Sequence, residues 1–335
     1  MVLQAVVNRL PVVPLPLIRA LAVVTVVGQA GIAVTGAVVR VTGSGLGCPT
    51  WPECFPGSLV PTPHPEVAAL NQWIEFGNRL LTIALVLAAG LTMLAVLTIR
   101  PRRRRLVWLA VAQPVGILAQ AVIGGFVVLS GLVWWSVAVH FLVSMVFTWL
   151  AVQLVVAVSD GGGPARSIVP GAVRGLVATS TAVLAALLVA GTLVTAAGPH
   201  AGDAATPRLG IEVAALAQLH ADLLFGYLGL LIGLGFTLRA TSAPRVVHRR
   251  YAVLVAVVLA QGALGGTQYA LGVPEVLAAL HVLGAGLVTV AAASMWAGLT
   301  ERPALPAPAG SGSGGTGEPV PVGEPVLTEG ARSGA

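Results

Sequence analysis

The 335-residue sequence contains no lysine, and charged residues of any kind make up only 9% of it. Hydrophobic residues account for 56%, and the mean hydropathy is +0.93. So little charge excludes a water-soluble globular domain and indicates a polytopic membrane protein. The isoelectric point near 10.6 comes entirely from arginine. In so apolar a chain we interpret the arginines as topology signals and expect no nucleic-acid partner.

Cysteine is nearly absent as well, because Cys48 and Cys54 are the only two. Two cysteines exclude a disulfide framework, and no suitably spaced histidine accompanies them to form a metal site. They lie in a Gly- and Pro-rich segment that we place on the oxidising side of the membrane. A short-loop disulfide is our first interpretation there, and a redox-active pair is the alternative.

Eight apolar segments are long enough to cross a bilayer of roughly 30 Å. They lie near residues 17–39, 73–99, 107–129, 134–157, 173–197, 212–238, 251–271 and 276–299. The first segment can span by itself, so we expect a retained helix and no cleaved signal. Residues 301–335 are rich in proline, glycine and serine and are expected to form a disordered cytoplasmic tail.

The arginines orient these segments. With eight spans, fifteen of the eighteen arginines fall on one side of the membrane. The exceptions are Arg40, Arg79 and Arg208. The positive-inside rule therefore predicts that both termini are cytoplasmic. The connections at about 40–72 and 198–211 then lie on the outer side.

One spaced pattern occurs twice in the chain. It consists of a glutamine, two adjacent glycines and a histidine, first at Gln120, Gly124, Gly125 and His140, then at Gln261, Gly265, Gly266 and His281, 141 residues later. A conserved offset between spaced matches indicates an internal repeat. We predict an all-α polytopic membrane protein with eight transmembrane helices arranged as two pseudo-symmetric four-helix bundles. Residues 1–160 form one half and residues 161–300 the other.

Three histidines lie at one depth in the predicted helices. His140, His220 and His281 are each about six to eight residues inside an outer helix end, or ~10 Å below the interface. A polar side chain there is costly unless it is paired or ligated. His220 and His281 come from alternate helices of one half, which is how helix bundles hold a haem between two imidazoles. The Gly-Gly pairs are explained equally well by a macrocycle lying close to the helix or by close helix packing.

The halves differ at the position that faces His140. Alignment of IEFGNRLLT (74–82) with AQLHADLLF (217–225) places Asn78 within a residue of the counterpart of His220. Asparagine is a poor iron ligand, so the first half offers at most one confident ligand. Nearby Glu75 is either functional or the ion-pair partner of Arg79, and both interpretations can hold together. Arg79, like Arg40, is placed to meet haem propionates or simply to reach the interface.

Several stretches then resemble the haem A synthase family. They are VVRVTGSGLGCPTWPEC, IEFGNR and GPHAGD, together with the histidines of the fourth, sixth and eighth helices. The resemblance covers about residues 17–299. It implies oxidation of the C8 methyl of haem O to a formyl group, by successive hydroxylations and loss of water. The product is haem A for aa3-type cytochrome oxidase.

The resemblance also implies a role for each candidate residue. His220 and His281 would hold a haem b cofactor, and His140 would ligate the iron of the substrate haem. Glu75 would be the essential acid, with Asn78 and Arg79 beside the substrate, and Cys48 and Cys54 match cysteines that form a disulfide in many bacterial members. The family pattern is glutamate, two residues, histidine and arginine; here Asn78 replaces that histidine.

Two other functions were weighed. A di-haem b-type cytochrome transferring electrons from quinol predicts two bis-histidine haems, which Asn78 argues against. A haem transporter predicts access from both faces, whereas the candidate ligands cluster on one. The synthase hypothesis predicts a bacterial cell-membrane protein with haem sites toward the outer face. Its expected partners are haem O, the haem O synthase that supplies it and an unidentified electron donor such as quinol, and the oligomeric state is left open.

Overall fold

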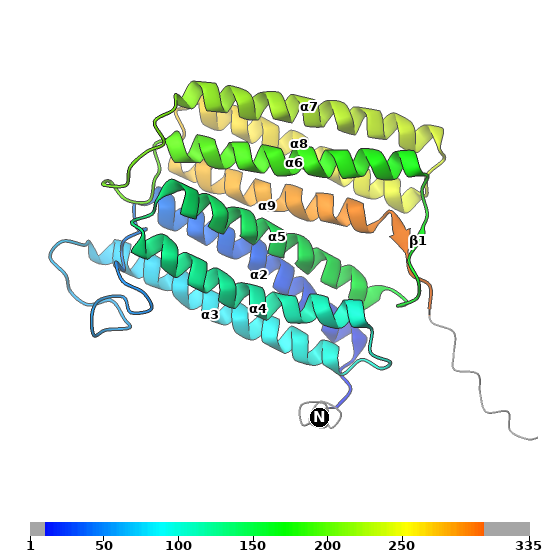
Figure 1. Cartoon of the computed structure of the whole chain (residues 1–335), viewed down its shortest axis with the longest axis horizontal. Helices are drawn as coiled ribbons and strands as arrows, with labels where there is room; N and C mark the ends of the chain where they lie inside the picture. Colours follow the sequence, from blue (N-terminus) through cyan, green and yellow to red (C-terminus); the bar gives the residue numbers. More distant parts are fainter. Residues whose placement is uncertain (1–10, 305–335) are drawn as a thin grey trace, which may run out of the picture.

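The computed structural model describes residues 11–304 and contains eight long helices in that range (Figure 1). They are α2 (Leu15–Val41), α3 (Ala69–Leu97), α4 (Arg104–Leu129), α5 (Trp134–Ser159), α6 (Gly171–Ala197), α7 (Val213–Ala240), α8 (Arg245–Ala270) and α9 (Glu275–Ala297). Each is long and apolar enough to cross a membrane. A helix suits that environment because it satisfies its backbone hydrogen bonds internally. The prediction of an all-α membrane protein with eight spans is confirmed.

Proline sets the start of several helices. Pro14, Pro170, Pro244 and Pro274 are the N-cap residues of α2, α6, α8 and α9. Proline lacks a backbone N–H, but the first N–H groups of a helix have no intrahelical acceptor, so proline loses nothing there. The largest boundary difference follows from this. Helix α8 begins at Arg245 instead of near residue 251, so it also contains His248.

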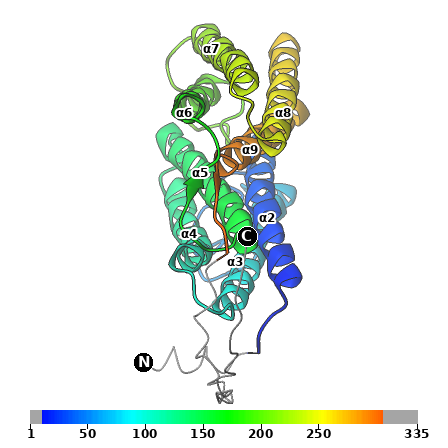
Figure 2. The same ribbon diagram turned by 90° about the vertical axis from the view of Figure 1, so that its right-hand side faces the viewer.

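The helices run side by side in two groups (Figures 1 and 2). Helices α2 to α5 pack as a closed bundle in which each helix contacts two neighbours. In the other group α6 packs on α7 and α8 packs on α9, whereas α7 and α8 have their backbones further apart and meet through side chains. The Tyr251 hydroxyl, for example, donates to the Leu231 carbonyl at 2.9 Å. Helix α9 joins the groups because it also packs on α2 and α5. The second group is therefore two hairpins that share one hydrophobic core.

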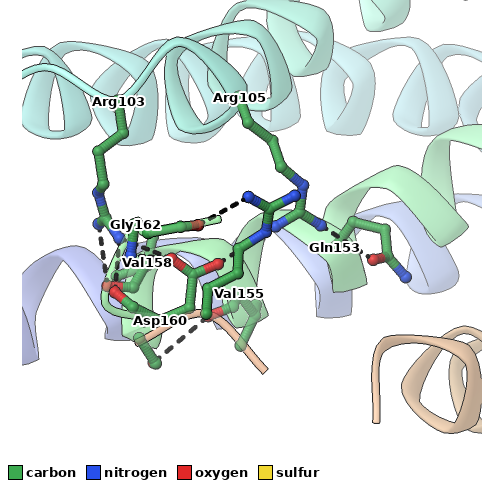
Figure 3. Close-up of polar contacts among 10 residues, drawn as sticks. Arg103, Arg105, Gln153, Val155, Val158, Asp160 and Gly162 are labelled. Carbon is green, nitrogen blue, oxygen red and sulfur yellow. Dashed lines mark hydrogen bonds and ion pairs between the residues drawn. The ribbon is translucent and has the colours of Figure 1, made fainter. Parts of the chain in front are cut away.

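A polar cluster ties helices together at the end where α4 begins and α5 ends (Figure 3). Asp160, the C-cap of α5, accepts from Arg103 at 2.8 Å and from Arg105 at 3.2 Å. Arg105 also donates to Gln153, whose amide donates to the Ala293 carbonyl of α9 at 3.0 Å. Two arginines interpreted as topology signals thus also connect α4 to α5, and through Gln153 to α9.

A short two-stranded sheet closes the same end. Strand β1 (Arg166–Ser167) pairs antiparallel with β2 (Thr300–Glu301). The Gly161 and Gly163 N–H groups donate to the Arg302 and Pro303 carbonyls, both at 2.9 Å. The first residues of the predicted tail, 301–304, are therefore ordered against the α5–α6 connection, because their backbone groups have partners there. The rest of that predicted tail lies outside the described residues.

Candidate functional site

A cavity of about 500 Å³ lies within the α2 to α5 bundle and extends to α6, α7 and α9, at the end formed by the 42–68 and 198–212 connections. Its size is typical of a small-molecule or cofactor site. Six predicted site residues line it: Glu75, Asn78, Arg79, His140, His220 and His281. The structure thus brings the histidines of both groups to one cavity.

Each of the three histidines packs against a glycine on the preceding helix. A methyl group added at Gly124 would lie 3.4 Å from His140 Cε1, and one at Gly265 would lie 2.8 Å from His281 Cε1. The sequence pattern did not single out Gly191 of α6, but a methyl group added there would lie 3.1 Å from His220 Cε1. The first glycine of each Gly-Gly pair therefore provides room for an imidazole. This role differs from both interpretations drawn from the sequence.

The second glycines of the pairs differ from each other. Gly125 lies against Trp51 so closely that an added Cβ would overlap the indole ring. Gly266 has no atom within 4 Å of that position. The first glycine of the repeated pair therefore has the same structural role in both halves, whereas the second glycine has a different environment in each half.

His220 is held in the tautomer that binds metals. Its Nδ1 lies 3.0 Å from the Leu187 carbonyl oxygen. A carbonyl only accepts hydrogen bonds, so Nδ1 carries the proton and Nε2 keeps its lone pair. The His220 and His281 ring centroids are 6.3 Å apart. An imidazole nitrogen binds a metal at about 2 Å, so two imidazoles on opposite sides of one iron would have ring centres roughly 6 Å apart. This pair fits an axial haem ligand set.

A glutamine fixes the helix that carries each repeated histidine. Gln120 Nε2 donates to the His140 carbonyl at 3.0 Å, and Gln261 Nε2 donates to the His281 carbonyl at 2.9 Å. The Nδ1 atoms of His140 and His281 are buried and have no partner among the described residues. Unsatisfied polar atoms in a membrane interior mark functional positions.

The burial pattern decides which residue of α3 corresponds to His220 of α7. Buried Leu85, Ala89, Thr92 and Val96 of α3 match buried Tyr227, Leu231, Leu234 and Leu238 of α7, each 142 residues later. The same offset places Asn78 at the position of His220. Its side-chain oxygen accepts from the Thr35 hydroxyl at 2.7 Å. One part of the cavity therefore has two imidazoles, and the other has one imidazole and an amide.

Glu75 and Arg79 form the predicted ion pair, with Nε and Oε1 3.1 Å apart. Glu75 is only 6% exposed and lines the cavity. The other guanidinium nitrogens of Arg79 donate to loop carbonyls, namely those of Cys48, Thr50 and Glu53. Arg79 therefore connects α3 to the 42–68 connection while it orients Glu75.

The 42–68 connection between α2 and α3 contains the predicted disulfide. Cys48 and Cys54 are bonded to each other and fully buried. Between them, Trp51 and Pro52 line the cavity. The loop is thus a cross-linked cap over the part of the cavity that holds His140.

A second outer connection contributes His200, to which no role was assigned from the sequence although GPHAGD was noted as a motif. The Arg40 guanidinium donates to the His200 carbonyl at 2.8 Å, and His200 Nε2 lies 2.8 Å from the Val273 carbonyl. Arg40 and His200 both line the cavity. His64 is instead exposed and stacks on Phe55.

Comparison with known proteins identifies the family. The model of the COX15-CtaA family, described as cytochrome oxidase assembly protein, matches residues 19–295. The chain belongs to this family.

Among its relatives are proteins named heme A synthase. The one from Geobacillus kaustophilus (strain HTA426) is 31% identical over 40% of this chain and 40% of its own length. The one from Bacillus pumilus (strain SAFR-032) is 31% identical over 38% of this chain and 41% of its own length. In Geobacillus thermodenitrificans the identity is 29%, over 40% of each chain. The matched region thus spans about 40% of the length of these relatives.

Proposed function

We propose that this COX15-CtaA protein is a haem A synthase that oxidises the C8 methyl group of haem O to a formyl group. The observation that supports the proposal is the unequal cavity, in which His220 and His281 lie close together whereas the repeat position that corresponds to His220 in the other half, beside His140 in the lining, is Asn78. A bis-histidine site suits a permanently bound haem, whereas one imidazole leaves the second axial position of a haem available for chemistry. The names of the relatives point to the same reaction.

Haem b held by His220 and His281 would supply one-electron transfer to the neighbouring substrate. His220 is suited to this binding because the Leu187 carbonyl fixes its proton on Nδ1. His281 is held in position by the glycine behind it and by Gln261 on its carbonyl. These contacts orient the two imidazoles before any ligand binds.

The substrate haem would bind through His140. Asn78 has a side-chain amide that is already bonded to Thr35, so it positions the macrocycle and does not replace the missing histidine. Glu75 lies on the same helix as Asn78 and is held by Arg79. We assign Glu75 the proton transfers that accompany hydroxylation and the final loss of water. Arg79 positions that carboxylate, and the disulfide loop, with Trp51, excludes water.

We place the protein in the bacterial cell membrane with both termini cytoplasmic and the cavity toward the outer face. Arg100 and Arg102 to Arg105, between α3 and α4, lie at the end opposite the cavity, as the positive-inside rule requires. The Cys48–Cys54 disulfide lies at the cavity end, which fits an oxidising compartment. The partners that follow are the haem O synthase and an electron donor such as quinol.

The direct test is haem analysis of cells that make haem O. Extracts should contain haem A only when this protein is expressed, and expression of His140→Ala should restore the haem O pattern. The measurement is chromatography of acid-extracted haems from aerobic cultures. Recovery of haem O and haem B alone with the wild-type protein would refute the proposal. Electron transfer by a di-haem cytochrome is less well supported, because that function needs a second bis-histidine site.

A further inference from the structure

Four polar side chains are buried in α2, α3 and α4, on the cytoplasmic side of His140. They are Thr25, Gln29, Thr92 and Gln113, none more than 3% exposed. The two threonine hydroxyls are 3.0 Å apart, and Gln29 Nε2 donates to Gln113 Oε1 at 3.1 Å. Because α2 ends at Val41, Gln29 lies about 18 Å along the helix from its outer end, near the middle of a bilayer. Amides there are costly and call for an explanation.

The other half of the protein shows that the fold does not need them. Helix α6 follows α2 at an offset of 155 residues, because buried residues recur at that spacing: Ile18, Ala22 and Thr25 of α2 match Val173, Val177 and Ser180 of α6. The counterparts of Gln29, Thr92 and Gln113 are then Leu184, Leu234 and Leu254. All three leucines lie in the hydrophobic core of α6 to α9. The same packing problem is thus solved there without amides.

The cavity extends deeper where the amides are. Gln29, Leu85 and Ile117 line its floor in the first half. In the second half the deepest lining residue of α6 is Leu188, one turn nearer the outer end, because Leu184 packs into the core below it. The additional depth therefore ends at the Gln29 side chain.

The amide pair has unused hydrogen-bonding capacity. Gln113 is 0% exposed, and its Nε2 has no partner among the residues that the structure describes. The single bond between the amides uses one donor group and one acceptor. Whichever way round the two amides are oriented, the pair retains a donor and an acceptor. Only Gln29 of the two lines the cavity, and its bond to Gln113 leaves it one N–H and its side-chain oxygen. A hydroxyl group, which both donates and accepts, is the complementary ligand.

We propose that Gln29, whose amide is held by Gln113, binds the hydroxyl group by which haem O is told apart from haem b, an inference that rests on the proposed function. Haem O carries this hydroxyl at the start of an isoprenoid side chain on the macrocycle edge, and haem b has none. His140 lies about 9 Å inside the outer end of α5, so Gln29 is roughly 9 Å deeper. This difference in depth would allow the haem iron to bind His140 while the hydroxyl group on the edge of the macrocycle reaches Gln29. The leucines of the other half suit a haem without the hydroxyl.

The test compares haem O with a derivative whose hydroxyl has been eliminated to an alkene. Purified full-length protein is offered an equimolar mixture, and the bound haems are extracted and separated by chromatography. Wild type should retain mainly haem O. Gln29→Leu, which copies the other half, should lower that preference about 3- to 10-fold, the worth of one neutral hydrogen bond. Gln29→Met, of similar length without the amide, should do the same.

Thr92→Leu is the matched control, because it also copies the other half but Thr92 does not line the cavity. It should leave the preference unchanged, and all variants should keep the resident haem spectrum. Two results would overturn the inference. In the first, the wild-type protein binds both haems equally well. In the second, Gln29→Leu weakens the binding of both haems equally, which assigns the amides to a water molecule or to pocket shape. If the wild-type protein prefers haem O in this assay but cells that express it form no haem A, the proposed function alone is refuted.

Discussion

At the scale of single residues, each of the three cavity histidines packs against its own glycine, but only His220 and His281 lie close to another imidazole. We expect His220→Ala and His281→Ala to abolish the tightly bound b-type spectrum, because each removes one of two facing imidazoles. His140→Ala should leave that spectrum largely intact while it abolishes formation of haem A. Visible spectroscopy of the purified variants measures the difference. Equal loss in all three would contradict the division of roles between the halves.

Arg79 pairs with Glu75 and also donates to carbonyls of the disulfide loop, and a double substitution separates these two contributions to stability. Arg79→Met removes the ion pair and leaves the buried Glu75 carboxylate alone, which should lower the free energy of unfolding by about 3–5 kcal/mol. Adding Glu75→Gln should recover part of this loss, since a neutral amide needs no counter-charge. Thermal unfolding in detergent is the measurement. If the double variant is as unstable as Arg79→Met, the loop contacts and not the ion pair dominate.

The sequence could predict which residues line the cavity, because histidine and glutamate are rare in apolar helices and therefore conspicuous. It could not predict His200 or Gly191. His200 acts through a loop contact with Val273, and glycine in an apolar helix is too common to stand out. The attachment of Arg79 to the disulfide loop depends on loop conformation, which hydropathy does not encode.

At the scale of secondary-structure elements, adjacent glycines of α8 provide a matched pair. Gly265→Ala places a methyl group 2.8 Å from the His281 ring, so we expect the ring or α9 to shift and binding of the resident haem to weaken. Gly266→Ala meets no atom within 4 Å and should behave as wild type. The extent of haem loss during purification distinguishes them. Similar behaviour of both variants would mean that the Gly265 contact does not fix the imidazole.

The helices themselves could be predicted almost completely, since eight separate apolar runs leave little choice in a membrane. The exception was the start of α8, which we expected near residue 251, after the arginines at 245, 249 and 250. Arginine is a good helix former, and Pro244 starts the helix before these arginines. Composition therefore indicates where the bilayer ends, whereas the N-terminal proline indicates where the helix begins.

At the scale of the whole molecule, the Asp160 cluster joins helices far from the cavity. Asp160→Asn removes the charge shared by Arg103 and Arg105, and we expect a loss of about 1.5–3 kcal/mol in the free energy of unfolding, with an unchanged haem spectrum. The exposed Asp222, bonded only to Gln218 on its own helix among the contacts described, supplies the control Asp222→Asn. Thermal unfolding measures both. A changed spectrum in Asp160→Asn would reveal coupling between the two ends of the molecule.

The sequence by itself determined the membrane class, the eight spans, the internal repeat and the unequal positions of Asn78 and His220. These follow from hydropathy and spacing, which are properties of residues read along one chain. Only the tertiary structure decided that both histidine sets line one cavity, that Arg79 holds the disulfide loop, and that Gln29 forms a polar floor. Those features depend on how each helix is rotated about its axis and which neighbour it meets. Helix rotation is set by side-chain packing between segments distant in sequence, so no single segment encodes it.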